Sequence, residues 1–177
     1  LISKHISKVA VPTAIGRSSS ALGFTILNGF IVSYGNEVVA AFSMVNRITD
    51  FWMQISMGIG AAMTSILAQN IGAKKYNRAY SIIGDAKKLV WITSITGVII
   101  LIIFNQEILS IFVKEAKDPL VYKNAMDYMS YAILIVPFMG LFNIYQGIFQ
   151  GSWKTKYSMF MSMGRLWAIR IMIKMIL

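Results

Sequence analysis

The 177-residue sequence has no cysteine, one histidine, three prolines and only seven acidic residues. Without cysteine, the chain can form no disulfide, thiol nucleophile or thiolate-bound metal site. His5 lies alone between Lys4 and Lys8, and the few acidic residues form no cluster with metal-ligand spacing. A nucleophile elbow, a phosphate-binding loop and a zinc-protease motif are also missing. These absences argue against an enzyme, so we predict no catalytic residue, metal site or cofactor.

Apolar residues are present in excess. Hydrophobic side chains make up 56% of the chain and charged ones only 14%, whereas an ordinary soluble domain has about 25% charged residues. A soluble domain of this length could not bury so much apolar surface in one core. The mean hydropathy of +0.63 agrees. We therefore predict an integral membrane protein, and disorder is excluded.

Uncharged runs mark the expected membrane spans, each needing about 20 apolar residues. Four such runs, and a fifth that basic residues interrupt, predict an all-α protein with about five transmembrane helices. Pro12 and Pro119 are placed to open helices. Pro137 lies inside a helix and must kink it, with Gly140 beside it as a candidate hinge. The kink can be static or can move, and both interpretations stay open. The predicted helices cover residues 12–34, 38–67, 89–112, 120–149 and 157–177.

The net charge of +10 comes from short basic clusters between the apolar runs. This pattern is typical of the cytoplasmic loops of membrane proteins, so no nucleic-acid partner is predicted. The charge bias places the N-terminus in the cytoplasm of a multi-pass protein of the cytoplasmic (inner) membrane. Segment 68–88 is predicted to be a cytoplasmic amphipathic loop, in which residues 74–88 form a helix lying on anionic membrane lipids. The bases on the N-terminal side are Lys4, Lys8, Lys74, Lys75, Arg78, Lys87, Lys88, Lys154 and Lys156, against Lys114, Lys117 and Lys123 on the other.

A polar stripe on the helix predicted at 38–67 is the strongest candidate site. Ionisable groups cost about 2.5–3.5 kcal/mol each inside a membrane, which makes them candidates for function. Arg47, Asp50 and Gln54 follow one another at spacings of three or four and share one helix face. The stripe can line a water-filled path with Asp50 as a cation or proton site. Alternatively, Arg47 and Asp50 form a structural ion pair.

Amide side chains supply the other candidates. Asn143 and Gln146, with Gln150 on the same face, lie in the second half of the helix predicted at 120–149. They can bind a ligand or donate hydrogen bonds to a neighbouring helix. Asn28 in the first helix is a weaker candidate, because such residues are tolerated between packed helices. The candidate cavity residues are Asn28, Arg47, Asp50, Gln54, Asn143 and Gln146.

Several segments near helix ends resemble those of one transporter family. The sequence LAQNIGAK at 67–74 resembles the loop after the eighth helix of multidrug and toxic compound extrusion (MATE) transporters. VAAF at 39–42 and NRITDF at 46–51 resemble the start of that helix. The stretch 137–151 and GSWKTK at 151–156 resemble the end of the tenth helix and the loop after it. The likeness covers nearly the whole chain in the right order.

The resemblance implies two six-helix lobes that face each other across a central cavity. Residues 1–177 would then be a partial C-terminal transmembrane lobe, from the seventh helix into the eleventh. The N-terminal lobe of the same polypeptide would be missing, and indeed the chain opens with Leu1 and ends within an apolar run, so both ends look cut. Family members export organic cations and other amphipathic compounds in exchange for H⁺ or Na⁺. The resemblance therefore implies part of a multidrug efflux antiporter with a small amphipathic substrate.

Two positions depart from the sodium-coupled branch of that family. The branch has a glutamate eight residues after the proline that opens its seventh helix. Counted from Pro12, this chain has Ser20 there. It also has an aspartate twelve residues before the glycine that closes its tenth helix. Counted back from Gly151, this chain has Met139 there. The coupling site for H⁺ or Na⁺ is therefore expected in the missing N-terminal lobe. Asp50 is the only acidic residue expected well inside a membrane span of this chain.

Two alternatives remain open. A lipid-linked oligosaccharide flippase of the same broader fold group would move an anionic lipid, and Arg47, Arg165 and Arg170 would suit it. Arg170 lies about 20 Å along the last predicted helix, so it should face protein or a cavity. A membrane scaffold that does not transport would use the polar stripes only as packing contacts.

Overall fold

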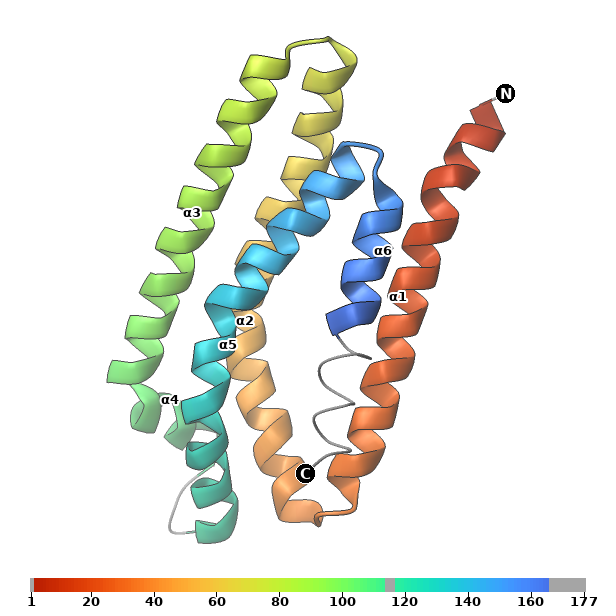
Figure 1. Cartoon of the computed structure of the whole chain (residues 1–177). Coiled ribbons are helices and arrows are strands. Elements are labelled where there is room, and N and C mark those ends of the chain that lie inside the picture. The colour runs from red at the N-terminus through yellow and green to blue at the C-terminus, as the bar shows by residue number, and fades with distance from the viewer. Residues whose placement is uncertain (1, 114–116, 166–177) are drawn as a thin grey trace.

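The computed structural model describes residues 2–113 and 117–165, and within these ranges it contains six α-helices and no strand (Figure 1). The all-α fold class predicted from composition is confirmed. The helices are α1 (Ile2–Val32), α2 (Asn36–Gly72), α3 (Tyr76–Ile103), α4 (Asn105–Phe112), α5 (Pro119–Gly151) and α6 (Thr155–Met163).

Two predicted helices differ from the structure. Pro12 was predicted to open the first, but α1 begins at Ile2 and Pro12 lies inside it. The third predicted helix differs most. The amphipathic helix predicted at 74–88 is present from Tyr76 on, but it is not separate from the next span, because α2 continues to Gly72 and α3 runs from Tyr76 to Ile103 as one helix. No proline interrupts α3, so its charged first turns extend the same helix beyond the apolar part. The predicted span at 89–112 also breaks at Phe104, where α4 begins. Most of the helix predicted at 157–177, including Arg170, lies outside the described residues.

Three of the described helices, α2, α3 and α5, are long and apolar enough to cross a membrane. α1 has 31 residues but is less apolar, because Arg17 and the three serines at 18–20 interrupt its hydrophobic sequence. α2 has 37 residues and is about 55 Å long at 1.5 Å per residue. The hydrocarbon core of a bilayer is about 30 Å thick, so α2 extends beyond it. The chain is a multi-pass membrane protein.

The helices form two groups that lie side by side. α5 packs along α2, with α3 against both of them and α4 beneath, whereas α1 packs mainly against α6 (Figure 1). The larger group holds two buried apolar clusters. One contains Val45, Leu101, Leu109 and Met129, and the other contains Met63, Ala86, Val90 and Ile144.

Glycines allow α2 and α5 to touch backbone to backbone. A Cβ added to Gly60 would lie 2.6 Å from the carbonyl oxygen of Asn143. One added to Gly147 would collide with the carbonyl oxygen of Gly60, and one added to Gly151 would lie 2.7 Å from that of Thr64. The Thr64 hydroxyl also donates a 3.3 Å hydrogen bond to the Gly147 carbonyl. This contact, which we call the glycine seam (Gly60, Gly147 and Gly151), fixes the spacing of the two helices.

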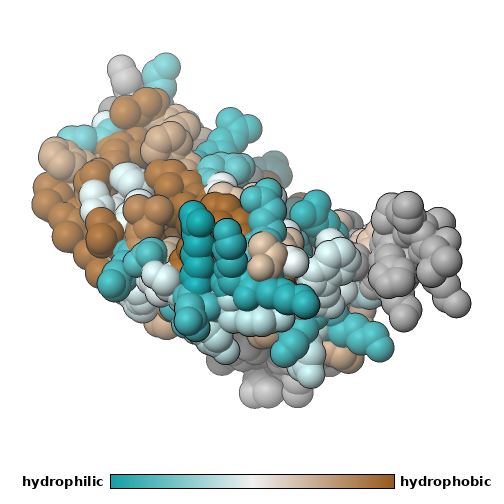
Figure 2. Space-filling view, turned by 90° about the horizontal axis from the view of Figure 1, so that it is seen from above, coloured by the Kyte–Doolittle hydropathy of each residue, from teal (hydrophilic) through white to brown (hydrophobic). Residues whose placement is uncertain are grey.

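The turns after α2 and after α5 lie at the same end of the molecule as the N-terminus (Figure 1). They are built alike, since Lys74 and Trp153 have positive φ angles of 58° and 61°. In each turn the next residue's amide donates to the carbonyl five residues earlier, at 2.8 and 2.9 Å. Figure 2 looks onto this end and shows hydrophilic side chains gathered there beside a hydrophobic flank. We call it the basic end (Lys74, Lys75, Arg78, Lys154 and Lys156, all exposed).

Candidate functional site

One face of α2 is polar and exposed. Arg47, Asp50 and Gln54 all lie on it. The opposite face packs into the protein, where Val45, Ile48 and other residues are buried against α5 and α3. No described helix covers the polar side. We call this the α2 stripe; it comprises Ser43, Arg47, Asp50, Gln54, Gly58 and Ala61, and every member is exposed.

Arg47 and Asp50 are neighbours on the α2 stripe, yet the described residues show no ion pair between them. The interpretation of these two residues as a structural ion pair therefore has no support in the geometry. Both charges instead remain available to whatever lies against the stripe. Two unpaired charges on a membrane helix are costly in lipid, so this face requires water or protein opposite it.

Two amide side chains of α5 form hydrogen bonds that hold α6 against it. Gln146 donates a hydrogen bond to the Ser162 hydroxyl, and Gln150 donates one of 3.2 Å to that of Ser158. Both serines are buried, so these bonds satisfy polar groups between packed helices. Of the two interpretations of this face, the structure shows the hydrogen bonds to a neighbouring helix. Asn143 is half-buried, and its main chain meets Gly60 across the glycine seam.

The remaining sequence candidates lie apart from the stripe. Asn28 is exposed on α1. Pro137 lies within α5, which continues unbroken to Gly151. A Cβ on Gly140 would lie 2.8 Å from the Ser94 hydroxyl and from a methyl group of Val90. Gly140 is therefore required for close packing against α3, and the movement of a hinge at Pro137 and Gly140 stays a prediction.

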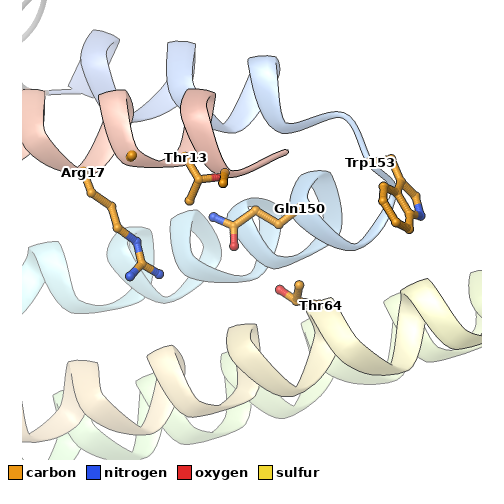
Figure 3. Close-up of a pocket in the computed structure, with 7 residues that line it drawn as sticks. Thr13, Arg17, Thr64, Gln150 and Trp153 are labelled. Carbon is orange, nitrogen blue, oxygen red and sulfur yellow. The ribbon is translucent and has the colours of Figure 1, made fainter. Parts of the chain in front are cut away.

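A cavity of about 540 Å³ lies between α1 and the ends of α2 and α5 nearest the basic end. Figure 3 shows Thr13 and Arg17 extending from α1 toward it, with Gln150 between Thr13 and Thr64. Sequence reasoning named none of these residues as a leading candidate, because they come from three distant segments. Gln150 had been noted only because it shares a face with Asn143 and Gln146, and Arg17 is a base next to an uncharged run. The lining residues are Ala10, Thr13, Ala14, Arg17, Thr64, Gln150 and Trp153.

Comparison with known proteins identifies the family. The MatE family model matches residues 12–176, which is nearly the whole chain. The chain belongs to the MatE family. The MATE resemblance drawn from the helix ends is therefore confirmed.

Three curated relatives share between 24% and 27% identity with the chain over the matched residues. The probable multidrug resistance protein YoeA of Bacillus subtilis is 27% identical over 111 residues, 61% of this chain and 23% of YoeA. The probable multidrug resistance protein NorM of Neisseria meningitidis serogroup B is 25% identical over 139 residues, 78% of this chain and 28% of NorM. A FAD transporter of Shewanella oneidensis is 24% identical over 132 residues, 75% of this chain and 28% of that protein. The chain thus spans about a quarter of the length of these relatives.

Arg165 lies next to one of the positions at which this MatE chain departs from the sodium-coupled branch. Its guanidinium donates a 3.3 Å hydrogen bond to the sulfur of Met139. It also lies 4.7 Å from the ring centre of Phe142 and 5.8 Å from that of Phe24, positions in which aromatic faces attract a cation. A guanidinium fixed beside Met139 repels any second cation there.

Proposed function

We propose that this chain forms most of one lobe of a multidrug efflux antiporter. In this proposal, amphipathic organic compounds, organic cations among them, leave the cell across the cytoplasmic membrane while H⁺ or Na⁺ enters. The basic end faces the cytoplasm, which agrees with the excess of positive charge on cytoplasmic loops. The other lobe belongs to the same polypeptide and supplies the coupling site. Apart from the coupling ion, no cofactor is required.

The observation that supports this proposal best is the exposed α2 stripe on a helix long enough to cross a membrane. Contact with lipid would cost about 2.5–3.5 kcal/mol for each charge. The other sides of α2 pack against α3 and α5. In this proposal the stripe faces a water-filled space between two lobes, and transporters hold their substrates at such an interface near the middle of the membrane.

Transport itself is tested with the purified protein in liposomes loaded with ethidium, an organic cation. We expect ethidium to move when a pH or sodium gradient is imposed, and the gradient that drives it identifies the coupling ion. Because one relative is named a FAD transporter, FAD is tested in parallel. If neither gradient moves any compound although the protein is folded, a flippase or scaffold takes the place of the antiporter.

Water should reach the α2 stripe, and this is measured by cysteine labelling. The chain has no cysteine, so a single introduced thiol gives a signal without background from this chain. We expect Gln54→Cys to react with a membrane-impermeant methanethiosulfonate reagent at least about tenfold faster than Ile95→Cys. Ile95 is 47% exposed on the apolar outer side of α3, where lipid would shield it. Equal rates at the two positions would favour the scaffold.

A further inference from the structure

The cavity between α1, α2 and α5 is a concave site with one charge. Its volume of about 540 Å³ lies within the range of about 300–1,000 Å³ that is usual for small-molecule sites. Arg17 is the single charged residue among the described residues that line it, and none of these is acidic. The described residues offer Arg17 no ion pair. An anion entering the cavity would therefore meet a guanidinium that no described carboxylate neutralises.

Two other polar side chains of the cavity are already engaged. The Thr64 hydroxyl donates to main-chain oxygens of the glycine seam, and the Gln150 amide donates to Ser158. Arg17 is therefore the main donor left for a ligand. A guanidinium binds a carboxylate or a phosphate through two parallel hydrogen bonds, which fixes the orientation of the anion.

Trp153 adds an aromatic surface. It lines the cavity from the turn after α5, where Figure 3 shows it, and is 59% exposed. Its φ angle of 61° is close to the 58° of Lys74, so the two turns share the same backbone conformation. The lysines around this end create a positive field that draws anions toward the opening.

We propose that this cavity binds a small aromatic organic anion, with its carboxylate or phosphate on Arg17 and its ring against Trp153. The inference goes beyond the proposed transport, because it concerns binding at equilibrium near the basic end and not movement across the membrane. The same anionic group could belong to a soluble compound or to the headgroup of an acidic phospholipid. The experiment separates these two sources.

Binding is measured by equilibrium dialysis on the purified protein in phosphatidylcholine nanodiscs, without any ion gradient. The probes are 2-naphthoate and 2-naphthamide, which have the same ring but differ in charge. We expect Arg17→Gln to weaken naphthoate binding about tenfold or more, as expected for loss of a charged hydrogen-bonding partner. Naphthamide binding should change less than about twofold. Arg17→Lys should retain part of the naphthoate affinity, since it keeps the charge but loses the paired geometry.

Two further variants control this result. Arg78→Gln removes one charge at the basic end away from the cavity and should leave naphthoate binding within about twofold of wild type. Trp153→Asn removes the ring while Asn tolerates the positive φ, so both probes should bind several-fold more weakly. The proposal is overturned if Arg17→Gln binds naphthoate as wild type does, or if Arg78→Gln weakens it equally. If Arg17→Gln weakens naphthoate binding, the source of the anion is tested by adding phosphatidylglycerol to the nanodiscs. Competition by this lipid identifies a lipid headgroup as the ligand, and no competition identifies a soluble anion.

Discussion

Replacing Gly147 by alanine is expected to remove most of the folded protein. The added Cβ would collide with the carbonyl oxygen of Gly60 and would lie 3.0 Å from its carbonyl carbon. All of the opposing atoms are backbone, so no side chain can turn away to make room. α2 and α5 must separate instead, and that would also open the contacts of Gly60 with Asn143 and of Gly151 with Thr64.

We expect Gly147→Ala to lower the free energy of unfolding by about 3 kcal/mol or more, the upper end for overpacking a core. The measurement is the yield of monodisperse protein in detergent together with its thermal unfolding. Gly84→Ala is the matched control, because Gly84 also lies within a helix but has no atom within 4 Å of an added Cβ. Alanine there should stabilise the helix by about 0.5–1 kcal/mol. Similar stability in the two variants would contradict the glycine seam.

The sequence predicted the existence of the helices better than their ends. The bounds of α5 agree closely with the prediction, because Pro119 marks its start and an uncharged run fills its second half. α3 shows why other ends were missed. Hydropathy reports where a helix leaves the membrane, whereas a helix ends only where its backbone hydrogen bonds stop. The charged side chains at the start of α3 lie in water, where a charge costs little free energy. α3 therefore extends through Asp85, Lys87 and Lys88.

The same distinction applies to the functional residues. Helical periodicity predicted that Arg47, Asp50 and Gln54 share a face, because only local geometry is needed for that. It could not predict which face packs inward, nor that Gln146 would bond to Ser162 across the turn after α5. The cavity was missed for a related reason. Arg17 and Trp153 lie far apart in the chain, and only the placement of α1 across the cavity from the end of α5 brings them to one site.

Neutralising Asp50 is expected to have the largest effect on transport. Asp50 is the one acidic residue of the α2 stripe, and Arg47 does not compensate its charge through an ion pair in the described structure. In Asp50→Asn the stripe keeps only the positive charge of Arg47, so an approaching organic cation loses the one carboxylate that attracts it and is repelled by the stripe. We expect gradient-driven ethidium efflux to fall about tenfold or more. Because Asp50 is exposed, the yield of folded protein should not change.

Asp85→Asn is the matched control for Asp50→Asn, since it removes the same charge from an exposed position on α3 near the basic end. Its efflux should stay within about twofold of wild type. Measuring ethidium binding without a gradient then separates two roles of Asp50. If Asp50→Asn loses binding as well as efflux, the carboxylate contacts the cation that is exported. If binding survives and only efflux is lost, Asp50 acts in coupling, which moves part of the ion pathway into this lobe. Full efflux in Asp50→Asn would show that the charge on the stripe has no part in transport.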